Sequence, residues 1–126
     1  MPANQPRGRS LLPLPVAEFH VLLALSDEDR YGHGIKLDIA ERTAGEVVMG
    51  PGTLYGAIRR MVRRRLIEER LPARSGQAHD RRRYYGLTSL GKEVAAQEAE
   101  RMKQLVEIAH AKRVVESWKT DLIVIP

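Results

Sequence analysis

Residues 51–65, PGTLYGAIRRMVRRR, begin with Pro51-Gly52-Thr53-Leu54-Tyr55 and decide how the rest of the chain is interpreted. Proline is favoured at the first position of a helix, because its missing N–H would have no partner there. Apolar residues then recur at helical spacing, which predicts one buried face formed by Leu54, Ile58, Met61 and Val62. The segment is therefore expected to be an amphipathic helix.

The opposite face of this expected helix is polar and strongly cationic. It consists of Thr53, Tyr55, Gly56, Arg59, Arg60, Arg63 and Arg64, and residues 51–65 contain no acid. Ordinary exposed faces mix acids with bases, so this face favours contact with nucleic acid over simple solvation. We expect Thr53, Tyr55 and one or two arginines to reach base edges, while the other arginines contact phosphates.

Two segments with strand character follow and enclose a polar loop. In Leu66–Leu71 and Arg81–Leu87 the apolar residues alternate, which predicts a buried face formed by Ile67, Leu71, Tyr85 and Leu87. The loop over residues 72–80 is too long for a tight hairpin, and we expect it to form a wing. Arg81, Arg82 and Arg83 lie where the ribbon leaves this loop and are expected to contact phosphates.

The upstream part of the chain predicts two more helices. After Pro15 a core-facing stripe runs to about Ser26 and comprises Val16, Phe19, Leu22 and Leu23. A connector over Ser26–Arg30 leads to a second helix, which Gly45 is expected to end in a left-handed conformation. The fold class is thus mainly α with a small β-wing, in which three helices and a two-stranded ribbon form a winged helix-turn-helix domain over residues 15–88. Residues 1–14 are predicted to be a flexible arm.

Thr88 is a good N-cap for a long helix from Ser89 to about Ser117, within a C-terminal segment of residues 89–118. A helix that projects from a small domain cannot bury an apolar stripe alone. We therefore expect a second subunit to cover Leu90, Val94, Met102, Leu105, Val106 and Ala109, although the helix could instead fold back over its own domain. Ala111, Val114, Val115 and Trp118 fall on nearly the opposite side, so the helix either breaks near His110 or meets a different neighbour there. The apolar tail, residues 119–126, could dock on the dimer or remain a tail.

Composition excludes several classes of function. A chain of 126 residues has room for one domain. It has no cysteine and only four scattered histidines, so we expect no metal site, no cofactor and a reducing, cytoplasmic location. There is no phosphate-binding glycine loop and no pair of carboxylates in an apolar context, which argues against an enzyme. The net charge of +5 is concentrated between Arg59 and Arg83, where ten arginines accompany three acids. No apolar run approaches the roughly 20 residues that would span a membrane.

The run at Pro51–Tyr55, Arg59, the Arg65-Leu66-Ile67 junction and the run Arg83-Tyr84-Tyr85-Gly86-Leu87-Thr88 closely resemble the PadR family of bacterial transcription regulators. The resemblance covers roughly Leu22 to Gly91. It implies a homodimeric winged-helix protein, commonly a repressor, whose single C-terminal helix pairs the subunits in short members. Gly50 stands where the family usually has serine, and Tyr31-Gly32-His33-Gly34-Ile35 departs from the usual second helix.

A two-fold dimer would place its recognition helices about 34 Å apart, one turn of B-DNA, so we expect an inverted-repeat operator. Some members of the family respond to small aromatic or drug-like molecules. Residues that could line such an effector site are Phe19, His20 and Trp118, together with Met102 and Leu105. The main alternative is a winged-helix interaction module that binds an acidic protein or RNA.

Overall fold

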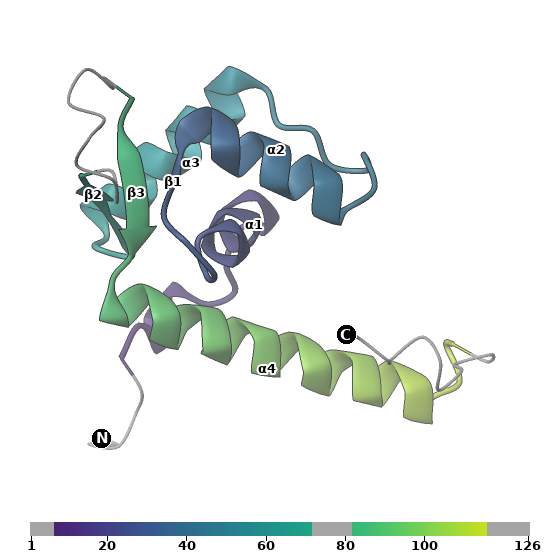
Figure 1. The fold of residues 1–126 in the computed structure, drawn as a ribbon. Coiled ribbons are helices and arrows are strands. Elements are labelled where there is room, and N and C mark those ends of the chain that lie inside the picture. Colours follow the sequence, from purple (N-terminus) through teal and green to yellow (C-terminus); the bar gives the residue numbers. More distant parts are fainter. Residues whose placement is uncertain (1–6, 72–81, 116–126) are drawn as a thin grey trace.

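The computed structural model describes residues 7–71 and 82–115. Its elements, in chain order, are η1 (Arg9–Leu11), α1 (Val16–Ala24), β1 (Arg30–Tyr31), α2 (Gly32–Arg42), α3 (Pro51–Arg63), β2 (Ile67–Arg70), β3 (Tyr84–Leu87) and α4 (Ser89–Ala111). Figure 1 shows α1, α2 and α3 gathered beside a small sheet, with α4 running beneath them and beyond. The winged helix-turn-helix fold with a long C-terminal helix, expected from the sequence, is confirmed.

The sheet has three antiparallel strands in the order β1-β3-β2, one more than the sequence predicted. The register pairs Tyr85 with Arg30 on one side and with Glu69 on the other. β1 was missed because two residues are too few to show an alternating pattern. Leu71 was predicted to be buried and is 89% exposed, because β2 ends at Arg70 and the ladder no longer covers it.

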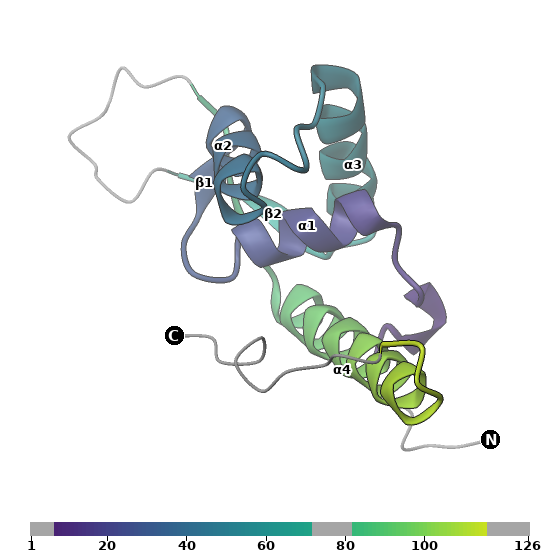
Figure 2. The ribbon, with the colours of Figure 1, turned by 90° about the vertical axis from the view of Figure 1, so that its right-hand side faces the viewer.

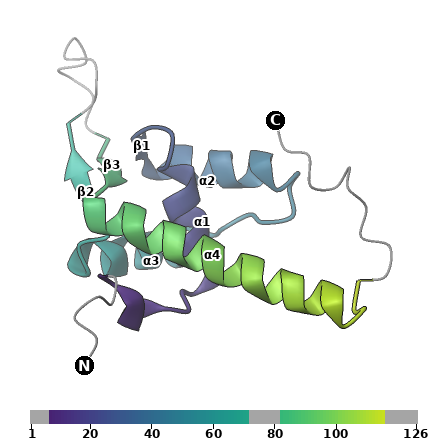
Figure 3. The same cartoon turned by 90° about the horizontal axis from the view of Figure 1, so that it is seen from below.

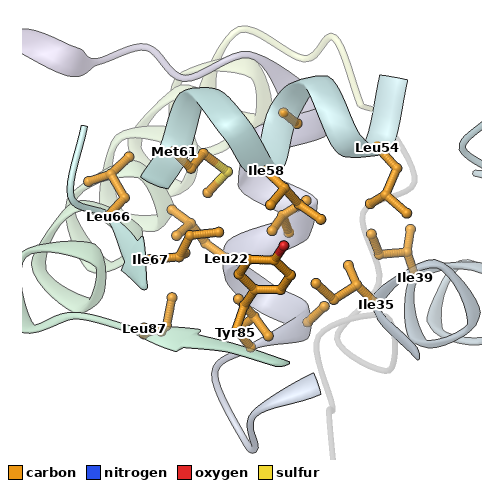
Figure 4. Packing of buried hydrophobic residues seen from close by; sticks show 14 of the residues in the cluster. Leu22, Ile35, Ile39, Leu54, Ile58, Met61, Leu66, Ile67, Tyr85 and Leu87 are labelled. Carbon is orange, nitrogen blue, oxygen red and sulfur yellow. The ribbon is translucent and has the colours of Figure 1, made fainter. Parts of the chain in front are cut away.

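Helix α1 lies at the centre and packs against α2, α3 and α4 (Figure 2). The close-up in Figure 4 shows Leu22 of α1 among side chains from α2, α3 and the sheet. Val16 was expected in this core but is 65% exposed. At 3.6 residues per turn, Val16 lies about 200° around α1 from Glu18. Glu18 is fully buried, so Val16 lies on the opposite, exposed side of the helix. Phe19 packs against the core and is half-buried.

Residues 7–14 lie against α4, which corrects the prediction of a flexible arm for this part of the chain (Figure 3). The backbone N–H of Leu14 donates to Oε2 of Glu98 at 3.0 Å, and Nε2 of Gln97 donates to the carbonyl of Arg7 at 2.8 Å. Leu11 and Leu12 pack against the core. The remaining residues of the predicted arm, 1–6, lie outside the described residues.

Helices α2, α3 and α4 are each followed, two positions after their last helical residue, by a residue with positive φ. These residues are Ala44 (53°), followed by Gly45 (82°), after α2, Arg65 (63°) after α3 and Arg113 (62°) after α4. Paired hydrogen bonds of the Schellman type close the ends, for example Leu66 N–H to Met61 O at 2.9 Å. The left-handed Gly45 agrees with its predicted role. Helix α4 stops at Ala111, short of the predicted Ser117 and close to the break considered near His110.

The start of α4 is joined tightly to the turn between α3 and β2. The hydroxyl of Thr88 accepts from Gly91 N–H at 3.0 Å, as predicted for an N-cap, and donates to the carbonyl of Arg65 at 2.6 Å. A Cβ atom on Gly91 would lie 2.0 Å from the carbonyl oxygen of Leu66, so only glycine permits this approach. The direction of α4 is therefore fixed relative to α3.

Candidate nucleic-acid interface

Helix α3 presents one apolar and one cationic face. Pro51 begins the helix, and its buried residues are Leu54, Ala57, Ile58 and Met61. Val62 was predicted on this face but is 38% exposed, and the smaller Ala57 occupies the side nearest the neighbouring helices. The exposed face is centred on Gly52, Arg59 and Arg63, which lie opposite the buried residues at about 100° per residue. Within residues 7–71 and 82–115, neither Arg59 nor Arg63 forms an ion pair.

Arg60 and Arg64 lie on the flank of α3 that faces α1. The Nε of Arg60 donates to Glu18 Oε2 at 3.0 Å, and Nη1 of Arg64 lies 3.4 Å from Glu18 Oε1. The Glu18 side chain has no exposed surface. Breaking a buried pair by removing its partner typically costs about 3–5 kcal/mol, more than one exposed ion pair returns. These two arginines are therefore held against α1 in the structure, and their contact with DNA stays a prediction.

Tyr55 is 40% exposed, and its ring rests on the start of α2. A Cβ atom on Gly32 would lie 2.4 Å from the Tyr55 hydroxyl oxygen. Glycine at position 32 thus lets the tyrosine lie across the junction of α2 and α3. Tyr55 lies at the edge of the exposed face of α3, and Thr53 is exposed on the first turn of this helix.

One arginine of the wing, Arg82, lies against two aromatic rings. The guanidinium of Arg82 lies 4.2 Å from the ring centroid of Tyr31 and 5.9 Å from that of Tyr84. The two tyrosine rings are themselves 5.6 Å apart. Such cation–π contacts attract the guanidinium to the faces of the rings and so orient the arginine. Arg83 lies 3.4 Å from Glu69 across the ribbon, and Arg81 lies outside the described residues.

A hollow of about 320 Å³ separates α3 from the wing. Arg59 enters it from α3 and Arg82 and Arg83 from the wing; its other lining residues are Tyr31, Gly32, Tyr55, Ile58 and Tyr85. Burial raises the pKa of the Tyr85 phenol, so this ring adds no negative charge near neutral pH. Three arginines, from α3 and the wing, thus line the same hollow, an arrangement suited to a phosphate backbone.

Comparison with known proteins agrees with this geometry. The model of the transcriptional regulator PadR-like family matches residues 21–97, more than half of the chain. The chain belongs to the PadR-like family. It is therefore a transcriptional regulator of a DNA-binding, winged helix-turn-helix family and not an enzyme.

Individual relatives of this PadR-like chain extend over most of its length. An uncharacterized protein of Lysinibacillus sphaericus is 31% identical over 90 residues, which cover 70% of this chain and 79% of that protein. A PadR family transcription regulator of Clostridium difficile has a TM-score of 0.65 at 24% identity, over 77% of this chain and 97% of its own. A PadR-like transcriptional regulator of Bacillus cereus has a TM-score of 0.59 at 25% identity, over 82% and 94%.

The predicted dimer residues of this PadR-like chain divide into two groups along α4. Val94 is fully buried within its own subunit, so its expected place in a dimer interface is wrong, and Leu90 packs partly against the same core. Farther along, Leu105 is 52% and Val106 41% exposed, while Met102 and Ala109 are half-buried. The sequence did not single out Ile108, which is 52% exposed. The division follows from length, because α1 covers only the first half of α4 (Figure 1).

The candidate effector residues are not brought together in what the structure describes. Phe19 and His20 are half-buried on α1, and Trp118 lies outside the described residues. Residues 7–71 and 82–115 contain no group of three metal-binding side chains, and no helix in these ranges is long and apolar enough to cross a membrane.

Two functional residues escaped the sequence analysis, for different reasons. Glu18 is a lone acid in an apolar helix, and its partners lie more than 40 positions away in the sequence. No local sequence pattern predicts such a contact. Tyr31 precedes a helix with weak signals, and its role depends on the approach of the wing. The cationic excess of α3 could have suggested a buried counter-charge, but not its position.

Proposed function

We propose that this PadR-like regulator is a cytoplasmic repressor that binds an inverted-repeat operator as a homodimer. The observation that carries the proposal is the convergence of Arg59 from α3 with Arg82 and Arg83 from the wing around one hollow. In winged-helix docking the recognition helix enters the major groove, about 12 Å wide, while the wing meets the neighbouring backbone. A sugar–phosphate strand passing between α3 and the wing would meet all three guanidinium groups.

The residues of the interface have different roles in this proposal. Arg63, at the centre of the exposed face of α3, enters the groove with Thr53 and Tyr55 at its edges, whereas Arg59 contacts the phosphate strand beside the hollow. Arginine can grip guanine with two hydrogen bonds, which is worth about 1–3 kcal/mol of discrimination between bases. The wing arginines, Arg81 to Arg83, bind phosphates and contribute affinity that does not depend on sequence.

The proposed dimer uses the second half of α4. Leu105, Val106 and Ile108 are exposed there, and the apolar stripe continues the side of α4 that α1 covers nearer the sheet. Burial of apolar surface stabilises association by about 25 cal/mol per Å², and a second α4 offers the same stripe by symmetry. Dimerisation would place two copies of α3 at a defined separation.

We also propose that a small aromatic or drug-like effector binds the protein and relieves repression. Phe19 and His20 are half-buried on α1. An effector that binds there must favour one state of the dimer, because equal affinity for both states shifts nothing. The chain has a single tryptophan, Trp118. We expect its fluorescence to be quenched by planar aromatic compounds, whereas no change across a broad panel would count against an effector.

The proposal is tested by fluorescence anisotropy with a labelled duplex from upstream of the gene and excess nonspecific duplex. We expect selective binding, and we expect Arg59→Ala and Arg82→Ala each to reduce the slope of log affinity against log salt by about one unit. Arg42→Ala is the matched control, because Arg42 pairs with Asp38 at 2.7 Å on α2, away from the hollow.

The rival function, binding of an acidic protein or RNA, gives a different result in the same assay. A module of that kind would bind the upstream duplex no better than the competitor, or would prefer a single-stranded RNA of equal length. Either result would overturn the operator assignment, and so would equal slopes for Arg42→Ala and Arg59→Ala.

A further inference from the structure

Glu18 is one of two acids that are fully buried in the described part of the chain. The other, Glu98, pairs with Arg101 on its own helix. Glu18 instead reaches from α1 to the recognition helix, where it contacts Arg60 and Arg64. Both arginines are only about half-exposed, at 42% and 43%, whereas Arg59 and Arg63 have no ion-pair partner in the described ranges.

We propose that Glu18 is a specificity-determining residue, which holds Arg60 and Arg64 against α1 and so withholds two cations of α3 from DNA phosphates. The inference rests on the proposed function, operator binding through α3. Because Glu18 is negatively charged, Arg60 and Arg64 together with Glu18 contribute a net charge of +1 instead of +2. Nonspecific binding depends almost entirely on phosphate contacts, so fewer free cations on α3 weaken it more than they weaken binding at an operator.

The geometry supports the view that Glu18 holds Arg60 and Arg64 away from the DNA groove. Arg60 and Arg64 lie on the flank of α3 next to α1, about 60–100° around the helix from Arg63. Arg60 uses its Nε for Glu18. If a phosphate bound both arginines and displaced them from Glu18, a fully buried carboxylate would lose both partners, and such an unpaired charge is strongly disfavoured.

Two neighbouring arginines provide the first test. Arg63→Ala and Arg64→Ala remove the same side chain from consecutive positions of α3, and the salt dependence of binding to a nonspecific duplex is measured for each. A phosphate contact contributes about 0.9 to the slope. We expect Arg63→Ala to lower the slope by about 0.9 and Arg64→Ala to leave it unchanged.

Glu18→Gln provides the second test, with Glu98→Gln as a control that also neutralises a fully buried acid. We expect Glu18→Gln to increase the slope by about one to two units and to tighten nonspecific binding roughly tenfold for each freed arginine at 0.1 M salt. The ratio of operator to nonspecific affinity should fall, while Glu98→Gln leaves the slope for the nonspecific duplex unchanged.

The outcomes separate this inference from the function on which it rests. If Arg64→Ala lowers the slope as much as Arg63→Ala, or if Glu18→Gln lowers it, Glu18 does not withhold the arginines and the inference is wrong while operator binding stands. If the wild-type chain binds no duplex, the proposed function itself fails. The Arg64→Ala result decides the inference even if Glu18→Gln does not fold.

Discussion

The backbone N–H of Leu14 donates a 3.0 Å hydrogen bond to Oε2 of Glu98, which joins the residue before the N-cap of α1 to the middle of α4. Arg101 holds the same carboxylate through contacts of 2.6 and 2.9 Å. Together with the Thr88 cap, this contact fixes α4 against the DNA-binding unit at two points. A rigid connection matters because the separation of two recognition helices must match a turn of DNA, about 34 Å.

The first prediction concerns the acid stability of this connection. The hydrogen bonds from Arg101 hold the pKa of Glu98 below its ordinary value of 4.5, although burial opposes them. The folded state thus favours the ionised form, so the stabilisation is complete above the ordinary value and is lost as pH falls through the lower pKa of the folded protein. We expect Glu98→Gln to lower the free energy of unfolding by about 2 kcal/mol at pH 7, measured by urea unfolding. The difference from wild type should shrink at pH 3, and a constant difference would contradict this explanation.

The second prediction concerns the dimer. Leu105→Glu places a charge in the proposed interface, where burial would be costly. We expect it to weaken self-association at least tenfold and operator binding with it, as measured by analytical ultracentrifugation and anisotropy. Leu37→Glu is the matched control, since Leu37 on α2 is 53% exposed and Leu105 52%. Equal behaviour of the two variants would mean that α4 is not the dimer helix.

The third prediction concerns Tyr55 and the glycine beneath it. In Gly32→Ala the new Cβ would lie 2.4 Å from the tyrosine hydroxyl, so the ring must move while the backbone stays in place. We expect a change in unfolding free energy below about 1 kcal/mol and an operator affinity about tenfold weaker. In a Tyr55→Ala background the same substitution should have no further effect on affinity. Additive losses would show that Gly32 acts independently of Tyr55.

The fourth prediction concerns the end of α3. Arg65 has a φ of 63°, which lies in the left-handed region, where residues other than glycine are disfavoured by roughly 1–2 kcal/mol. Arg65→Gly should therefore raise the free energy of unfolding by about 1 kcal/mol relative to Arg65→Ala, which loses the same charge but keeps the strain. Chemical denaturation of the two variants measures the difference. Equal stability would mean that the turn relaxes without a left-handed residue.

The helices and the wing could be predicted because their signals are local. Pro51 and the apolar spacing after it define α3, and Thr88 defines the start of α4 within a few residues. The run from Tyr84 to Thr88 also carried the family resemblance, which the match over residues 21–97 confirms.

Features that depend on distant contacts could not be predicted in this way. Val94 belongs to the same stripe as Leu105, but α1 and residues 7–14 cover α4 near Val94, which is buried inside the subunit, whereas Leu105 is exposed. Leu11 and Leu12 lie among prolines and polar residues, yet they cover α4. Glu18 gave no local sign of its burial, although it changes the role of two arginines.

Selection of bound duplexes from a random DNA library tests the account most directly. A homodimer that reads DNA with α3 and the wing should enrich an inverted repeat whose half-sites are centred about one helical turn, 10–10.5 base pairs, apart. The enrichment should disappear for the Arg59→Ala, Arg63→Ala double variant. A single asymmetric site, or no enriched sequence from a folded protein, would contradict the central claim.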